Sequence, residues 1–433
     1  MPTIIRNIPS PEAVPNTAPP TRAALWVVTT LFFMWGFVTV LNDILVPQLK
    51  SVFDLNYAKV MLIQFAFFSA YFIFSIPSAK IIDWIGYKQT MVAGLVTMGA
   101  GALLFIPAAS VPSYPLFLCA LMVLAAGITA LQVAANPYVA VLGPSATASS
   151  RLNLAQAFNS LGTTIAPYLG GLIILNAAPK NLETVRQMSA EALQAYRVQG
   201  ASSVKLPYLI IGLALLGLAL VIGRFQLPPM PTAQHKAGHS VRALWKYRHL
   251  VLGAVGIFVY VGAEVSIGSF LVNYFNQPEI GHLVEKDAAK FVSYYWGGAM
   301  VGRFIGSAIL QKVRTGTVLG IAASIAAILV CTSMLALGGI AMWSIILVGL
   351  FNSVMFPSIF TLGIAELGPL TGDGSGWLIM AIVGGAIIPV AQGVIADHMG
   401  IHHAFVLPVL CYLYIVYYAF RGSAPAPMIS TTV

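Results

Sequence analysis

Apolar residues in this chain run in long stretches, and charged side chains interrupt them rarely. Of the 433 residues, 58% are hydrophobic and only 8% are charged, and the mean hydropathy is +0.87. A soluble chain carries about 25% charged residues, so this composition cannot cover a surface that faces water. Most of the outer side chains must face lipid, which predicts an all-α membrane protein with many crossings.

The number of apolar runs gives the number of predicted crossings. A helix needs about 20 apolar residues to span the hydrocarbon core of a bilayer. The two longest polar interruptions are 177–204 and 226–248. The sequence predicts twelve transmembrane helices, at 24–51, 57–83, 89–109, 114–142, 149–176, 205–225, 249–276, 289–311, 316–338, 341–367, 374–397 and 402–420.

Prolines recur at similar places in the two halves of the chain. Pro137 in the fourth predicted helix corresponds to Pro357 in the tenth, and Pro167 in the fifth corresponds to Pro389 in the eleventh. Such a parallel repeat predicts two pseudo-symmetric six-helix halves, which is the pattern of major facilitator transporters. The predicted parts are a disordered cytoplasmic tail (1–21), a first half (22–225), a cytoplasmic linker (226–248), a second half (249–421) and a second cytoplasmic tail (422–433).

Basic residues fall unevenly on the two sides that twelve crossings define. With the N-terminus inside, Lys and Arg are more frequent in the inner loops than in the outer loops. The positive-inside rule then predicts that both termini lie in the cytoplasm, and we expect a bacterial inner-membrane protein. We interpret the net charge of +9 as this topology signal, and we expect no nucleic-acid partner.

The loop between the second and third predicted helices has a recognisable pattern. The sequence "AKIIDWIGYK" at 79–88 places Asp83 at a helix end, Gly86 at the turn and Lys88 at the start of the return. It resembles the facilitator loop motif, small-x-x-x-Asp-x-x-Gly-x-Lys, but departs from it at Trp84 and Tyr87, where basic residues are usual. A gating or structural role is predicted, and an ordinary tight inner loop is the alternative.

Polar side chains inside the apolar runs mark the candidate site. A charge at the centre of a spanning helix costs about 2.5–3.5 kcal/mol on insertion scales, so such residues usually line an aqueous cavity. Three are present, Asp43, Glu264 and Arg303. The predicted substrate-binding set joins Glu264 with Asn42, Gln64, Gln132, Asn136, Gln156, Asn159, Asn273, Tyr294, Trp296 and Asn352.

The spacing of the amides supports a shared surface. Gln132 and Asn136 lie four residues apart on one helix face. Next to them, Pro137 has no N–H to offer the carbonyl of Val133, which weakens that helical turn. Convergent amides favour a neutral, hydroxyl-rich ligand such as a sugar, because one amide donates to one hydroxyl and accepts from another. The alternative is that the amides join helices through hydrogen bonds of about 0.6 kcal/mol each.

The charged residues suggest separate roles. A carboxyl group partly removed from water takes up a proton more readily, so Asp43 is the first candidate for cation coupling and Glu264 the second. For Asp43 the alternative is a permanent pair with a neighbouring donor. Arg303 is predicted to be structural, pairing near the inner face with Glu366 or Asp373.

Five segments together resemble one family. The sequences "LNDILVPQL", "AANPYVAVLGP", "RLNLAQAFNSLGTTIAP", "YVGAEVSIGSFLVNYF" and "GRFIG" are similar to the fucose:proton symporter family of the major facilitator superfamily, on its glucose/galactose branch. The resemblance implies twelve helices, a monomer and uptake of a hexose with a cation. It also implies a protonatable pair, of which Asp43 is present, whereas Gln132 replaces the second carboxylate. Gln132 is nevertheless kept in the cation-coupling set.

The function predicted is import of a glucose- or galactose-like sugar, coupled to H⁺ or Na⁺, by alternating access. Fucose, N-acetylglucosamine or fructose are alternative substrates, and a uniporter or drug exporter is an alternative transporter. A membrane enzyme or a sugar-sensing membrane protein is the alternative of another class. No metal or organic cofactor is expected, because the chain has no phosphate-binding glycine loop. Its close histidines, His398, His402 and His403, are interpreted as outer-loop residues, with a metal site there as the alternative.

Overall fold

The structure is a computed structural model that describes residues 19–52, 57–111, 113–174, 187–189, 191–192, 204–230 and 241–425. The side chains of 19–21, 41–52, 57–61, 168–174, 241–243 and 285–286 lie outside the described part. Over the described ranges the chain is helical and contains no strand. The prediction of an all-α protein is therefore confirmed.

The first group of helices ends before residue 225. Its order along the chain follows the predicted spans, and the 3₁₀ helix η1 connects α3 to α4. The elements are α1 (Pro19–Val52), α2 (Tyr57–Ser110), α3 (Tyr114–Val141), η1 (Ser145–Thr147), α4 (Ala148–Ile174) and α7 (Lys205–Arg224).

The second group follows the 3₁₀ helix η2 and contains more interruptions. Several of its predicted spans are divided into two or three shorter helical pieces. The elements are η2 (Val241–Lys246), α8 (Arg248–Asn276), α9 (Glu285–Ile309), α10 (Thr315–Leu335), α11 (Gly338–Asn352), α12 (Met355–Gly363), η3 (Gly368–Leu370), α13 (Thr371–Met380), η4 (Ala381–Val383), α14 (Gly384–Met399), α15 (Ile401–Ala404), α16 (Val406–Tyr417) and η5 (Tyr418–Gly422).

Nine helical segments among the described residues are long and apolar enough to cross a membrane. One of them, Leu62–Ser110, has 49 residues, which is enough for two crossings at about 1.5 Å per residue. The polar helices α4 and α9 are also long enough for one crossing each, with 27 and 25 residues. The number twelve stays a prediction, which these three helices support.

Gly86 divides α2 into two helices. Its backbone angles are φ 79° and ψ 168°, in a region that residues with a side chain rarely adopt. This is the glycine that the sequence placed at the turn between the second and third predicted crossings. The turn that the sequence predicts between these two crossings is thus made at a single residue with non-helical backbone angles.

The tenth predicted crossing, 341–367, is broken where the sequence gives a reason. Helix α11 ends at Asn352 and α12 begins at Met355. Pro357 lies four residues after Ser353 and has no N–H for the carbonyl of that residue, so the helical ladder is interrupted at this point. The break leaves Asn352 at a helix end in the middle of the crossing.

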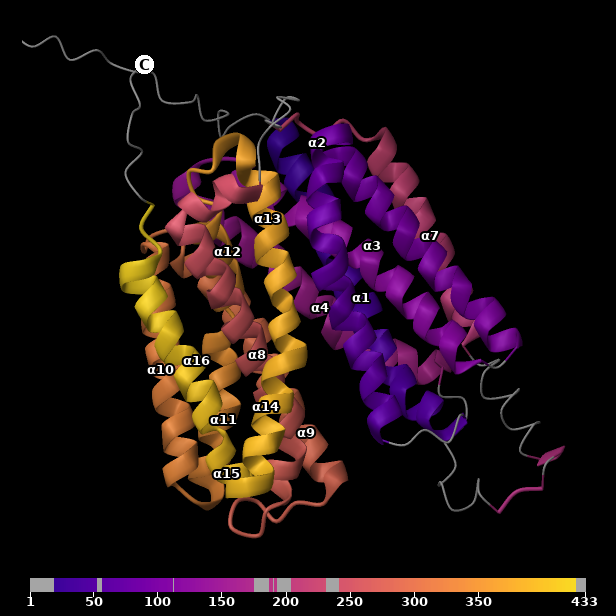
Figure 1. The fold of residues 1–433 in the computed structure, drawn as a ribbon, viewed down its shortest axis with the longest axis vertical. Coiled ribbons are helices and arrows are strands. Elements are labelled where there is room, and N and C mark those ends of the chain that lie inside the picture. Colours follow the sequence, from indigo (N-terminus) through magenta and orange to yellow (C-terminus); the bar gives the residue numbers. More distant parts are fainter. Residues whose placement is uncertain are drawn as a thin grey trace, which may run out of the picture.

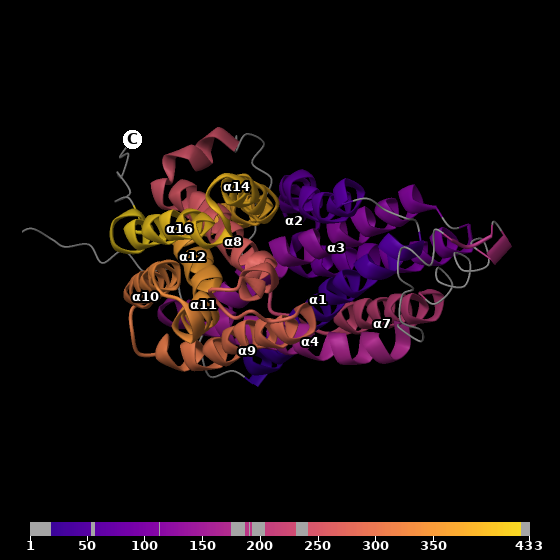
Figure 2. The same cartoon turned by 90° about the horizontal axis from the view of Figure 1, so that it is seen from below.

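The helices form two groups that meet along one side (Figure 1). Elements α1–α7, called here the first half, pack mainly on one another, and elements from α8 onward, the second half, do the same. The halves meet where α13 packs on α2 and α3, and where α4 packs on α9 and α12. Figure 2 shows the two groups side by side when the bundle is seen along its length.

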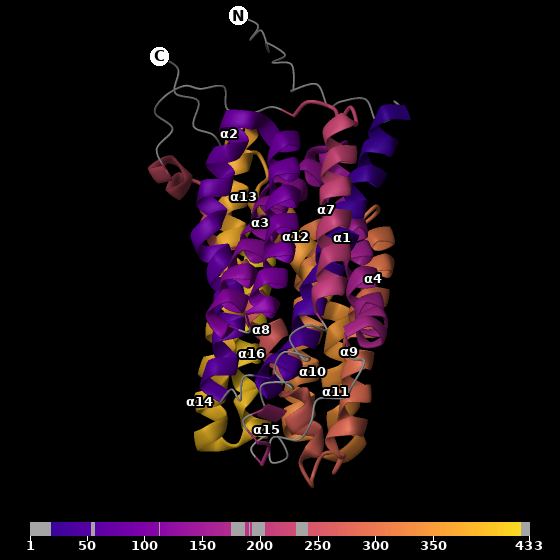
Figure 3. The same ribbon diagram turned by 90° about the vertical axis from the view of Figure 1, so that its right-hand side faces the viewer.

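One end of the bundle carries both described ends of the chain. Helix α1 begins at this end, at the top of Figures 1 and 3, and η5 lies toward the same end in Figure 1; we call this the termini end. Gly376 of α13 lies so close to α2 that an added Cβ would meet Ala79 at 2.9 Å and the carbonyl of Ser75 at 3.2 Å. Glycine therefore permits the tight contact between the halves toward this end.

Replacing Gly86 tests the kink. A Cβ at Gly86 would meet no atom within 4 Å, so Gly86→Ala should cost only backbone strain, about 1–3 kcal/mol of unfolding free energy. Gly217→Ala in α7 is the matched control, because its added Cβ also meets nothing within 4 Å and its backbone is helical. Detergent-induced unfolding of the purified protein measures both. Equal stability of the two variants would contradict the assigned strain.

Candidate functional site

Asn352 is the centre of a buried polar cluster in the second half. Its side chain is fully buried at the end of α11. Asn352 Nδ2 donates to Tyr295 Oη at 2.9 Å, and Asn352 Oδ1 accepts from Tyr412 Oη at 2.8 Å. One amide therefore joins α9 and α16 to the break in the tenth crossing, and both of its polar atoms are satisfied inside the bundle.

Glu264 is connected to this cluster through Tyr260. Tyr260 Oη lies 2.8 Å from Glu264 Oε1 and 3.1 Å from the carbonyl oxygen of Asn352, and its single hydrogen serves both acceptors. Tyr260 and Glu264 are four residues apart on α8, so they share a face. Tyr260 is buried, whereas Glu264 stays partly exposed. The carboxylate is thus held on one side and open to a ligand on the other.

Arg303 lies between this cluster and the first half. It interacts electrostatically with Glu264, and its Nη1 donates to Ser160 Oγ of α4. The backbone carbonyl of Arg303 accepts from Asn153 Nδ2 at 2.6 Å. The cation therefore offsets the charge of Glu264 and, through the same side chain, contacts the opposite half. The predicted pairing with Glu366 or Asp373 stays a prediction.

Three of the predicted amides meet on the first half. Gln156 Nε2 lies 3.4 Å from Asn136 Oδ1, which brings α4 to α3. Gln132 Nε2 donates to Tyr71 Oη at 2.9 Å. All three amides are buried, and Asn136 Nδ2 has no partner in the described part of the structure. Gln132 and Gln156 thus join helices in this structure, while Asn136 has a buried donor without a partner among the described residues.

The remaining predicted substrate residues are more dispersed. Asn159 Nδ2 donates to the carbonyl of Phe32 at 3.0 Å and so fixes α4 to α1. Gln64, Asn273, Tyr294 and Trp296 have exposed side chains, and the structure does not bring them into the buried cluster. The side chains of Asn42 and Asp43 lie outside the described part, although their backbone is in α1.

The predicted loop motif packs against the start of α13. Asp83 and Asp373 both lie close enough to Tyr87 to interact with it electrostatically. Lys88 Nζ donates to the carbonyl of Gly223 at 2.8 Å, at the end of α7. The lysine thereby holds a helix end within its own half. A gating role of the loop stays a prediction.

The carbonyl that Pro137 frees has a specific partner. Ser375 Oγ of α13 donates to the carbonyl oxygen of Val133 at 2.8 Å, and the serine is fully buried. The sequence predicts the weakened turn, and the structure shows that a hydroxyl from the opposite half completes it. A proline in one half thus creates an acceptor for the other.

Sequence reasoning missed the hydroxyl groups of this site. Tyr71, Tyr260, Tyr295 and Tyr412 are the hydrogen-bond partners of the amides and the carboxylate, and Ser160 is the partner of Arg303. A tyrosine four residues before Glu264 was the available signal. The other partners come from distant segments, and spacing within one helix carries no information about them.

The fold and the site together define a class of protein. A bundle of membrane-crossing helices in two groups, with buried amides and a partly exposed carboxylate near their interface, has the construction of a secondary transporter. The family model of the Major Facilitator Superfamily matches residues 25–382. The chain belongs to this superfamily and is a multi-pass membrane transporter of bacterial type. The prediction of a transporter in place of an enzyme is confirmed by this membership.

The similar proteins include sugar transporters. A glucose/galactose transporter of Brucella abortus is 53% identical over 404 residues, which cover 92% of this chain and 94% of that protein. An L-fucose-proton symporter of Escherichia coli is 37% identical over 405 residues, with 91% of each chain covered. The crystal structure of the transporter FucP in the outward conformation superposes with a TM-score of 0.88 at 35% identity, covering 94% of this chain and 100% of that chain.

Two neighbouring tyrosines of α9 test the polar cluster. Tyr295 is buried and bonded to Asn352, whereas the side chain of Tyr294 is 56% exposed. Tyr295→Phe leaves a buried amide hydrogen without an acceptor and should lower the unfolding free energy by about 1–3 kcal/mol. Tyr294→Phe should change it by less than about 0.5 kcal/mol. Detergent-induced unfolding measures both variants, and an equal effect would argue against the Asn352 cluster.

Proposed function

We propose that this protein imports a neutral hexose, glucose- or galactose-like, together with a cation. The observation that carries the proposal is the setting of Glu264, a partly exposed carboxylate in the middle of α8 that Tyr260 holds and Arg303 offsets. The side chain is oriented by the protein while one side stays open. Such a group binds hydroxyls through charge-assisted hydrogen bonds, which are stronger than neutral ones.

The polar groups favour a neutral substrate. The buried amides supply both donors and acceptors, which suits sugar hydroxyls. Arg303 is the basic residue that the sequence places deep within a crossing, and it already contacts Ser160 and faces Glu264. An anionic substrate would need positive charge that is not already offset. The similarity to a glucose/galactose transporter and to an L-fucose-proton symporter supports a hexose.

Asp43 is the residue to which we assign the coupling cation. The cation that we propose is a proton. At the position where the fucose-type resemblance implies a second carboxylate, Gln132 donates to Tyr71, and an amide does not titrate. We therefore propose that a single carboxylate of α1 carries the coupling ion, with Glu264 as the acidic residue of the second half. Na⁺ is the alternative, since a carboxylate with amide and carbonyl oxygens also suits that ion.

The proposed orientation has both termini in the cytoplasm of the bacterial inner membrane, with 226–248 as the cytoplasmic linker between the halves. With this orientation, the contacts of α13 with α2 and of α4 with α9 lie at the cytoplasmic end. The structure then corresponds to an outward-facing state. Its similarity to FucP in the outward conformation supports this assignment.

Uptake into proteoliposomes tests the function. With an inward proton gradient, wild-type protein should accumulate labelled glucose or galactose. Asp43→Asn should lose this accumulation but keep the exchange of sugar at equal concentrations on both sides, because the variant still binds sugar but no longer couples its transport to the proton. Asp287→Asn is the control, since the side chain of this residue is 48% exposed and pairs with Lys290 at 2.8 Å on the surface of α9. Full accumulation by Asp43→Asn would reject the coupling role.

Two further conditions separate the alternatives. A sodium gradient that drives uptake where a proton gradient does not would assign Na⁺ as the coupling ion. Preference for fucose, N-acetylglucosamine or fructose in the same assay would replace the substrate but keep the mechanism. No accumulation of any hexose under either gradient would reject symport and favour a sensor.

A further inference from the structure

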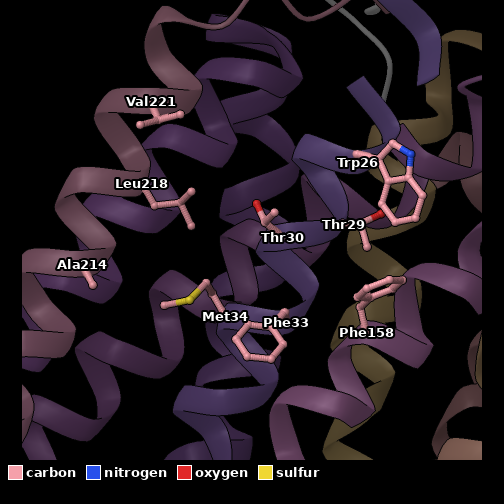
Figure 4. Close-up of a pocket in the computed structure, with 9 residues that line it drawn as sticks. All are labelled: Trp26, Thr29, Thr30, Phe33, Met34, Phe158, Ala214, Leu218 and Val221. Atoms are coloured by element: carbon pink, nitrogen blue, oxygen red, sulfur yellow. The ribbon is translucent and has the colours of Figure 1, made fainter. Parts of the chain in front are cut away.

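A groove of about 490 Å³ lies on the first half, between α1, α4 and α7 (Figure 4). Trp26 and Met34 of α1, Phe158 of α4, and Ala214 and Leu218 of α7 form much of its wall. None of these residues belongs to the predicted sugar site. Figure 4 shows the α7 side chains facing those of α1 across the groove.

The wall of the groove presents apolar surface even at its two threonines, Thr29 and Thr30. Thr29 Oγ1 donates to the carbonyl of Leu25 and Thr30 Oγ1 donates to the carbonyl of Val27, both at 2.7 Å. These hydroxyls are thus occupied within their own helix and offer little to a polar ligand. An alkyl chain is the ligand that such a wall fits, because it buries apolar surface without leaving polar groups unpaired.

Two arginines lie on α1 and α7, each about one helical turn from a wall residue of the groove. Arg22 is four residues before Trp26 on α1, and Arg224 is three residues after Val221 on α7, so each shares a face with a wall residue. Helix α1 begins and α7 ends at the termini end (Figure 3). The two guanidinium groups therefore belong to the same end of the groove.

The depth of these arginines matches a lipid headgroup. Arg22 starts one candidate membrane span, Arg22–Val40, and Arg224 ends another, Lys205–Arg224. Both side chains are exposed, and neither has an ion-pair partner within the described ranges of the chain. Lys88 Nζ, bound to the carbonyl of Gly223, adds positive charge beside Arg224. Arginine at this depth is well suited to a phosphate, to which it donates in a bidentate manner.

We propose that this groove binds one anionic phospholipid, with an acyl chain along α1 and α7 and the phosphate at Arg22 and Arg224. The charge complementarity at the mouth selects an anionic headgroup over a zwitterionic one. The exposed indole of Trp26, at the level of the interface, covers the glycerol region as interfacial tryptophans do. The lipid fills a gap where α7 does not pack closely on α1.

Native mass spectrometry of the full chain in detergent tests the site with phosphatidylglycerol and phosphatidylcholine as probes. Wild-type protein should retain one phosphatidylglycerol and bind phosphatidylcholine more weakly. Arg22→Gln and Arg224→Gln should each weaken phosphatidylglycerol binding about fivefold, and the double variant about 25-fold. Arg421→Gln, at an exposed arginine of η5 in the second half, should leave binding unchanged.

A bulky residue in the groove tests the acyl-chain part. Ala214→Trp should abolish retention of the lipid, whereas Leu213→Trp, on the adjacent residue of α7 and outside the wall, should not. If Ala214→Trp does not yield folded protein, the arginine variants decide alone. Equal binding of the two lipids, unchanged binding in the double arginine variant, or retention by a folded Ala214→Trp would each overturn the proposal. Displacement by inorganic phosphate at millimolar concentration would also overturn it, because the headgroup alone would then suffice.

Discussion

A charge inside an apolar helix must be compensated by the protein itself, and the centre of this structure follows from that requirement. Glu264 in α8 is offset by Arg303 of α9 and held by Tyr260, whose hydroxyl also reaches the carbonyl of Asn352. Asn352 then needs partners and takes them from Tyr295 and from α16. Each polar group thus requires the next one, and the cost of leaving any of them unpaired fixes four helices around the carboxylate.

The contact between the halves is of a different kind. It includes hydroxyl groups and glycines: Ser149 Oγ lies 2.6 Å from Thr361 Oγ1, Ser150 Oγ donates to the carbonyl of Ser307 at 2.7 Å, and Gly376 packs on α2. Hydrogen bonds of this type contribute about 0.6 kcal/mol each within a membrane. A closely fitted surface held by such weak bonds can separate and reform, which alternating access requires. Arg303 is where this surface meets the charged cluster, since it contacts Ser160 and faces Glu264.

The sequence predicts the helices better than it predicts the site. Apolar runs have a physical length requirement, so nearly every predicted span reappears. Gly86 and Pro357 mark two of the breaks, because glycine permits a positive φ and proline has no N–H for the helical ladder. The amide and carboxylate of Asn352 and Glu264 were found because polar groups stand out in apolar runs. Their partner Tyr412 was not, because tyrosine is common in membrane helices and its pairing depends on how distant helices pack. Asp43 remains a prediction from sequence alone.

Sugar binding by a Glu264 variant tests the central claim most directly. If this carboxylate receives the substrate, Glu264→Gln should weaken the affinity of purified protein for its transported hexose about 10-fold or more in isothermal titration, because a hydrogen bond to a charged group contributes about 1.5–3 kcal/mol. Glu279→Gln, on an exposed segment after α8, should retain wild-type affinity. Unchanged affinity in a folded Glu264→Gln protein would contradict the account and move the substrate away from the Asn352 cluster.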